Sequence, residues 1–290
     1  MNTLELISAL KIHGSFPTSD ELFSEPDFLV LFNHQLQVEI IPMMRKLNEE
    51  YFLQYKDFDI AGNSTFRIPT RAIGSSIRDL KIIDSSGNQT PLNRLYEEDR
   101  GNGASGYFIV RNSVELTSGF TNGTLRMKYF ARPGKLVLPT ACAKIVSIAG
   151  TVIEVDAAPA TMANNVLIDF IQNTNPYDAM AIDVPLAGVS GTTFTFAEVP
   201  SDLAVGDWIT IATESPVPMV PEEMHSVLIQ SALCKTLSSK KDKSYKDELE
   251  TLQRVKEDAV NMLDPRVENN SNKVRTGKLL GYFSNSTRRF

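Results

Sequence analysis

The residues of this sequence best suited to chemistry are two acids and a histidine near the start of a predicted helix. Glu222, Glu223 and His225 could together act as metal ligands or as an acid–base pair. A zinc-binding helix, however, needs two histidines four residues apart that flank a glutamate. Acids in the first turn are also favoured by the helix dipole alone. We therefore interpret these residues as part of a helix start and predict no catalytic or metal site there.

A glycine-rich stretch at residues 101–106 could in principle wrap a phosphate. A phosphate-binding loop of this kind continues into Lys-Ser or Lys-Thr and opens a helix, and neither feature follows residue 106. Thr276-Gly277-Lys278 resembles the end of such a motif but lacks the upstream glycine. We predict a hairpin loop at residues 101–106 and no bound cofactor.

The remaining candidates for metal, disulfide or nucleophilic chemistry are isolated. His13 and His34 have no cysteine, aspartate or second histidine at ligand spacing. Cys142 and Cys234, the two cysteines of the chain, are far apart and suggest neither a zinc site nor a disulfide framework. No serine nucleophile elbow is present. The sequence therefore predicts a protein that is not an enzyme.

The composition is that of an ordinary globular protein. Of 290 residues, 42% are apolar and 22% charged, and the net charge of −6 gives no global attraction to nucleic acid or to an anionic membrane. No run of about 18 apolar residues occurs, and the first residues lack a basic leader. We expect neither a membrane span nor an export signal, and a reducing compartment suits the two cysteines.

Apolar periodicity predicts helices at both ends of the chain. A short helix is expected at residues 2–12 and a longer one from residue 24 to about 55, with a kink or break at Pro42. Helix returns at 221–239 and 243–263, before Asp264-Pro265. Each helix has an apolar stripe too wide to leave in water, so we expect the two sets to pack together.

Between these helices the apolar period changes to two from Phe58 onward, which predicts antiparallel β structure. Gly87-Asn88 and Asn122-Gly123 are expected to form turns, since Asn-Gly favours two-residue hairpins. Pro133-Gly134 and Pro139 separate two β regions. The predicted strands are 65–68, 80–83, 107–110, 114–116 and 125–130 in the first region, and 144–148, 152–155, 166–171, 193–196 and 208–211 in the second.

The sequence thus predicts an α+β fold, in which a helical base formed by N- and C-terminal helices carries inserted antiparallel β units and an extended C-terminal tail. Proline-rich sequence holds a stiff, extended geometry, so Pro216, Pro218 and Pro221 are predicted to form a rigid hinge at the joint of strands and helices. The expected parts are an N-terminal helical part at 1–57, a β region at 58–139, a second β unit at 140–215, C-terminal helices at 216–264 and a C-terminal arm at 265–290.

The C-terminal arm differs in charge from the rest of the chain. Its 26 residues hold six basic residues and one acid, a net charge of +5. Three interpretations stay open: a solvated tail, an arm that orders on an acidic partner surface, and a segment that makes salt-sensitive contacts with nucleic acid. The residues expected to bind a partner are Arg266, Lys273, Arg275, Lys278, Tyr282, Phe283, Arg288, Arg289 and Phe290.

Several stretches resemble one family of viral proteins. GDWITIATESPVPMVPEEMHSVLIQSAL, followed by a charged helix and DPRVENNSNKVR, resembles the C-terminal signature of bacteriophage head-to-tail adaptor proteins, also called neck or connector proteins. FRIPTRAIGSSIRDLKIIDSSGNQTPLNRLYEED and YFIVRNSVELTSGFTNGTLRMKYFARPGKLV are similar to the β region of the same family. The likeness spans most of the chain, although the block at 140–213 is larger than in the smallest adaptors.

The resemblance implies a virion structural protein of the head–tail junction, assembled in the host cytoplasm. It implies a homo-oligomeric ring, a dodecamer that matches the portal, whose C-terminal arms embrace the portal protein. Further tail or neck proteins would bind the ring, and DNA would pass through its channel without specific contact. Such a ring requires no catalytic residue, cofactor or membrane.

Two alternatives from other classes are a β-rich glycan-binding module on a helical oligomerisation stem and a hydrolase. Trp208 fits a core position better than a glycan platform, and the β units show no paired carboxylates at a recognisable spacing.

Overall fold

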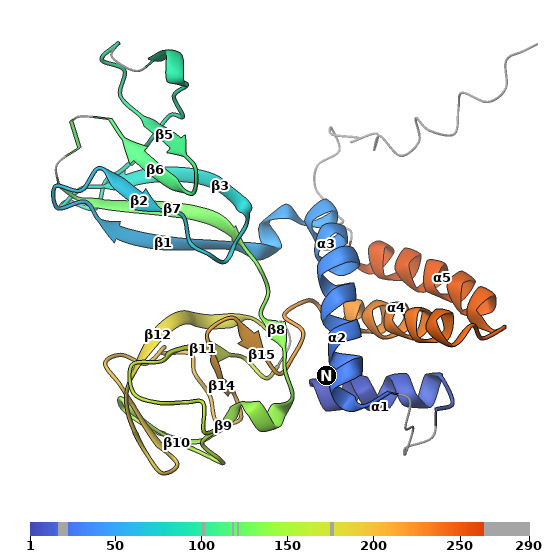
Figure 1. Ribbon diagram of the computed structural model, residues 1–290. Helices are drawn as coiled ribbons and strands as arrows, with labels where there is room; N and C mark the ends of the chain where they lie inside the picture. Colours follow the sequence, from blue (N-terminus) through green and yellow to red (C-terminus); the bar gives the residue numbers. More distant parts are fainter. Residues whose placement is uncertain (17–22, 100–101, 118, 121, 175–176, 264–290) are drawn as a thin grey trace, which may run out of the picture.

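The computed structural model describes residues 1–16, 23–99, 102–117, 119–120, 122–174 and 177–263. Three bodies meet at one junction: a helical base, a first β unit and a β barrel (Figure 1). Helices from both ends of the chain pack together and antiparallel β units are inserted between them, so the predicted α+β class is confirmed. The predicted C-terminal arm, residues 265–290, lies outside the described residues.

The helical base is centred on one helix near the end of the described chain. This helix, α4, has twelve buried residues and contacts α1, α2 and α5. One core joins Leu10 and Phe32 from the first helices to Val227 and Leu252 from the last two. The helices are α1 Thr3–His13, α2 Glu25–Gln35, η1 Leu36–Ile40, α3 Ile41–Leu47, η2 Glu49–Phe52, α4 Glu223–Lys240 and α5 Tyr245–Leu263.

Pro42 interrupts the second predicted helix through a π turn. The chain passes from α2 into the π-helical segment η1 and then into α3, which has Pro42 in its first turn. A π turn adds a residue to the helix and makes room for a proline ring that cannot donate an N–H. The predicted end of this helix, at about residue 55, is wrong, because α3 ends at Leu47 and strand β1 already begins at Leu53. The helical spacing of Met43, Leu47 and Tyr51 is the reason that the sequence predicts a longer helix.

The first β unit consists of two sheets that share one core. The sheet β1-β7-β3-β4 contributes Leu80 and Met127 to that core, and the sheet β2-β6-β5 contributes Phe66 and Val114. Alternation of buried and exposed positions places these side chains on the facing sides. The strands are β1 Leu53–Asp59, β2 Thr65–Arg67, β3 Ala72–Ile83, β4 Gln89–Pro91, β5 Tyr107–Val110, β6 Ser113–Leu116 and β7 Thr124–Ala131, with a short helix η3 at Glu97–Asp99.

The two predicted turns behave differently. Gly87-Asn88 lies between the paired strands β3 and β4, where the Asp84 carboxylate accepts hydrogen bonds from Asn88. The hairpin predicted at Asn122-Gly123 is wrong, since the strands on either side of it, β6 and β7, belong to different sheets. Gly123 has a φ of +112°, and a Cβ atom there would lie 2.8 Å from the Ile83 carbonyl oxygen. The glycine is required for this close approach rather than for a hairpin.

The second β unit is a closed six-stranded barrel in the order β10-β13-β12-β11-β14-β9. Its interior is filled by large side chains such as Phe170, Phe194 and Ile209. One long strand, β12, was not predicted. The strands are β9 Ala143–Ala149, β10 Val152–Val155, β11 Leu167–Ile171, β12 Ala179–Ser190, β13 Thr193–Phe196 and β14 Trp208–Ile211.

A short two-stranded stem connects the barrel to the rest of the molecule. The chain enters the barrel through β8 Lys135–Leu136 and the short helix η4 Pro139–Ala141, and it leaves through β15 Glu214–Ser215. These two strands pair in parallel, Glu214 with Lys135 and Ser215 with Leu136. Within the described ranges, no helix has the length and apolar character needed to cross a membrane.

Candidate functional site

The predicted hinge lies where the three bodies meet. Pro216, Pro218 and Pro221 are all buried, and Val217 between them is also buried. The Pro216 carbonyl accepts a hydrogen bond of 2.8 Å from the Thr3 N–H of α1. This segment is therefore packed against the N-terminal helices and is not a solvated linker.

Two side chains of the helical base hold the stem by hydrogen bonds to its backbone. The Asn33 amide on α2 donates to the Leu136 carbonyl at 2.9 Å and accepts from the Leu136 N–H at 2.7 Å. The Thr3 hydroxyl donates to the Val137 carbonyl at 2.8 Å. Asn33 thus satisfies both backbone groups of one stem residue, as a neighbouring strand would.

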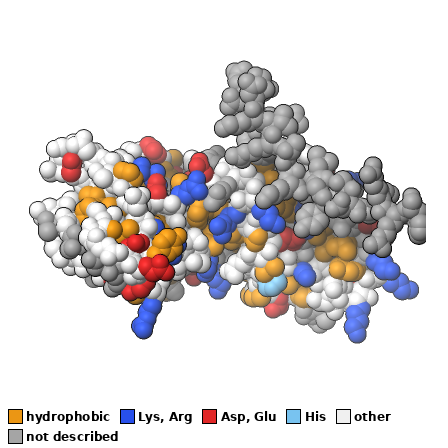
Figure 2. All heavy atoms as spheres, turned by 90° about the horizontal axis from the view of Figure 1, so that it is seen from above, with side chains coloured by type: hydrophobic (Ala, Val, Ile, Leu, Met, Phe, Trp, Pro, Cys, Tyr) orange, Lys and Arg blue, Asp and Glu red, His pale blue; other side chains and the backbone are white. Residues whose placement is uncertain are grey.

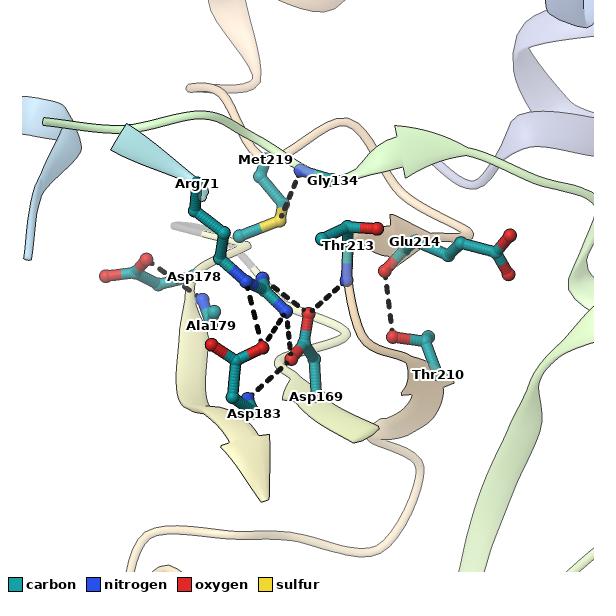
Figure 3. A network of polar contacts seen from close by, with 10 residues as sticks. All are labelled: Arg71, Gly134, Asp169, Asp178, Ala179, Asp183, Thr210, Thr213, Glu214 and Met219. Carbon is teal, nitrogen blue, oxygen red and sulfur yellow. Dashed lines mark hydrogen bonds and ion pairs between the residues drawn. The ribbon is translucent and has the colours of Figure 1, made fainter. Parts of the chain in front are cut away.

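An ionic network joins the first β unit to the barrel. Arg71 precedes β3, and its guanidinium donates to both carboxylate oxygens of Asp169 on β11 at 2.7 Å each. It also donates to Asp183 on β12 at 2.9 and 3.2 Å. Figure 3 shows the guanidinium between the two carboxylates. This bidentate geometry is the strongest form of Arg–carboxylate pairing.

The carboxylate of Asp169 is fully satisfied although it is only 2% exposed. Besides Arg71, it accepts hydrogen bonds from the backbone N–H groups of Asp183 at 3.0 Å and Thr213 at 3.1 Å. Burial raises the pKa of Asp169, and Arg71 together with these N–H groups acts in the opposite direction. A buried charge with this many partners fixes the relative position of the elements that supply them.

Sequence reasoning missed this network, although one signal was present. Asp169 interrupts the apolar run of residues 166–171, which was predicted as a strand. A charged residue in a buried strand needs a partner. The partner, Arg71, lies 98 residues away and in another body. The pattern could therefore indicate that Asp169 needs a partner, but not which residue that partner is.

A second buried polar group lies at the junction of α4 and the barrel. The His225 ring is 1% exposed and lies 5.2 Å from the Tyr177 ring, centroid to centroid. Burial lowers the pKa of His225 to about 4, and the nearby N-terminal ammonium group acts in the same direction. Glu222 and Glu223 do not complete a metal site with it, since no group of three His, Cys, Asp or Glu side chains in the described part of the chain could hold a metal ion.

A groove of the barrel lies between β12 and the residues that follow β13. It has a volume of about 920 Å³. Four carboxylates line it, from Asp178, Asp183, Glu198 and Asp202, and partial desolvation raises the pKa of Asp178. We call it the acidic groove. Its chemistry suits a cationic ligand or peptide.

The remaining candidates are structural. Cys142 and Cys234 are both buried and unpaired, and burial raises the pKa of the Cys234 thiol to about 11. His13 and His34 are exposed. Trp208 is 6% exposed and its ring N–H donates to Asn173 at 2.8 Å, so it is a core residue as predicted.

Comparison with protein-family models and with curated proteins gives no match for this chain.

Proposed function

We propose that this protein is a virion structural protein, a head-to-tail adaptor of a tailed phage. Its copies form a homo-oligomeric ring, its C-terminal arms attach the ring to the portal protein, and its β units offer the surface to which the tail or further neck proteins bind. The observation that carries the proposal is a helical base, built from both ends of the chain, with exposed apolar side chains on different helices.

One apolar face belongs to the N-terminal helices. Ile12 on α1 is 77% exposed and Val30 on α2 is 68% exposed. A groove of about 480 Å³ runs beside Val30, between α2 and the stem, and is lined by Pro26, Leu29 and Leu138 among others. Figure 2 shows apolar side chains at the surface of the helical half of the molecule, between charged ones.

Exposed apolar side chains also lie on the C-terminal helix. Leu249 and Met262 of α5 are exposed, on opposite flanks of its buried side, and a groove of about 520 Å³ is lined by Met43 and Val260 together with Lys256, Glu257 and Asn261. Because α4 is buried between its neighbours, the faces of α1 and α2 are distinct from that of α5. Contact between two different faces of identical copies is heterologous, and it closes into a ring when the rotation per copy divides a full turn.

The connections between the bodies suit such a ring. The buried hinge, the stem and the ionic network hold both β units in one orientation relative to the helices. A ring of many copies needs this uniformity, because an error in the angle of one copy would be repeated at every interface.

The test is the assembly state of the full chain, measured by mass photometry and by electron microscopy of stained particles, alone and with portal rings. Rings of uniform diameter that attach to the portal are expected. A chain that stays monomeric even with portal rings would contradict the proposal. Particles that bind a glycan array but form no rings would favour the glycan-binding alternative.

A further inference from the structure

The acidic groove contains an open strand edge. Residues 179–185 of β12 pair with β11 on one side, whereas pairing with β13 begins only at Leu186. Beyond Phe196, the end of β13, the chain diverges and forms the opposite wall of the groove. No other strand among the described residues pairs with 179–185. The Asp183 N–H already donates to Asp169 and Pro185 has no N–H, so residues 179–182 are the part of this edge that can act as a template for an added strand.

The groove around this edge is built for a cationic segment. Among the described residues, Asp178, Glu198 and Asp202 have no ion-pair partner, and no lysine or arginine lines the groove. Asp183 is already paired with Arg71. Apolar side chains lie between the acids: Met180, Val184 and Val199. An extended peptide with basic and apolar residues would satisfy the edge, the acids and the apolar wall together.

The chain itself contains a segment with this chemistry. Residues 265–290 carry a net charge of +5 and the apolar groups Val274, Leu279-Leu280 and Tyr282-Phe283. No proline follows Pro265, so the segment can donate backbone hydrogen bonds along its length. At roughly 3.3 Å per residue, 26 extended residues span about 85 Å, enough to reach a neighbouring molecule.

We propose that the acidic groove binds the C-terminal arm of a second copy of this chain, which adds as a β strand to the edge of residues 179–182. The arm follows α5 in sequence, and the residues that line the groove belong to the barrel. Figure 1 shows α5 and the barrel in separate bodies of the molecule. The groove holds the basic arm while no other partner is bound, and a partner that needs the arm must compete with it. This inference concerns the protein alone and does not rest on the proposed attachment to a portal.

The test is disulfide trapping between two full-length variants. One carries Ala197→Cys, at an exposed position of the groove, and the other carries Ser284→Cys in the arm. The native cysteines are buried and can stay. Mixed and oxidised, the two variants are expected to form a reducible dimer containing one chain of each kind. Ala149→Cys, an exposed barrel residue outside the groove, is the matched control and is expected to give little dimer.

Charge provides a second, independent measurement. Glu198→Lys combined with Asp202→Lys is expected to reduce the yield of the mixed dimer about fivefold or more, as is high salt. Glu154→Lys, an exposed barrel acid outside the groove, should leave the yield unchanged. Thermal melts of each variant serve as the control for folding.

Three outcomes would overturn the inference. The first is equal trapping at positions 149 and 197. The second is an unchanged yield in the Glu198→Lys and Asp202→Lys variant. The third is trapping only within single chains that carry both Ala197→Cys and Ser284→Cys, which would place the arm on its own subunit. Failure to bind a portal affects none of these measurements, so the two proposals can fail separately.

Discussion

Arg71 and Asp169 form a bidentate ion pair across the boundary between the first β unit and the barrel, with both N–O distances at 2.7 Å. Both side chains are buried. Breaking such a pair leaves one charge without compensation in a medium of low dielectric, which costs far more than the net gain from forming it.

Replacing Arg71 with methionine should therefore destabilise the protein strongly. Arg71→Met keeps the apolar length of the side chain but leaves Asp169 without its cation, and we expect the free energy of unfolding of the barrel to fall by about 3–5 kcal/mol. Fluorescence of Trp208, the single tryptophan and a buried barrel residue, reports that transition during denaturant unfolding.

Arg126→Met is the matched control. Arg126 also forms a two-point ion pair, with Asp57, but within one sheet and partly exposed. Its replacement is expected to cost less than about 1 kcal/mol. Equal losses in the two variants would show that the position of the Arg71 pair between two bodies has no special energetic role.

His225 should make stability depend on pH. Its pKa in the folded protein is lowered to about 4, so the unfolded chain takes up the proton first as the pH falls. The stabilising effect of the neutral ring is complete above about pH 6.5 and is lost between about pH 6.5 and 4, a total of about 3 kcal/mol. Denaturant unfolding of wild type and of His225→Gln across this range measures the difference.

His34→Gln is the control for that experiment, because His34 is exposed on α2. It should retain the full pH dependence of the wild type, whereas His225→Gln should lose about 3 kcal/mol of it. If both variants follow the wild-type curve, the buried ring does not titrate in the way that its surroundings require.

Val30 should belong to a contact between copies. Val30→Asp places a charge on the exposed apolar face of α2, and we expect the stability of the single chain to change by less than about 0.5 kcal/mol. Assembly should require at least about tenfold more protein, the equivalent of 1.4 kcal/mol per contact. Val205→Asp, at an equally exposed position of the barrel, should assemble as wild type does, as judged by mass photometry.

The C-terminal arm should be dispensable for folding. Residues 1–263 by themselves supply the side chains that fill the described cores of the helical base and of both β units, and we expect deletion of residues 265–290 to change the melting temperature by no more than about 2 °C. Attachment to portal rings should be lost in co-sedimentation. A milder variant, with Arg288→Ser and Arg289→Ser, should weaken attachment and increase its salt sensitivity. A deletion variant that fails to fold would show that the arm is part of the core.

Helices and most strands could be predicted because their signals are local. The capping box of α1 and the apolar stripe of α5 mark these helices, and alternation of buried and exposed positions marks strands such as β6 and β13. Strand β12 was missed because Asp183, Pro185 and Gly188 break the alternation. These residues are accommodated where the register shifts and where one edge stays unpaired.

The contacts that join the bodies could not be read from local patterns. Arg71 lies in a turn, and arginine is usually exposed. Nothing near it in sequence identifies Asp169 as its partner. The same holds for Asn33, whose place beside Leu136 depends on how α2 meets the stem. Such contacts depend on the tertiary arrangement and cannot be predicted from the periodicity of apolar residues.

The parallel pairing of β8 with β15 brings the two ends of the barrel segment side by side, Leu136 opposite Ser215. A segment whose ends are adjacent can be exchanged for a shorter or longer one without moving the helices that carry it. Removal of the barrel from this scaffold would take partners from two buried groups: Arg71 would lose Asp169 and Asp183, and His225 would lose the Tyr177 ring.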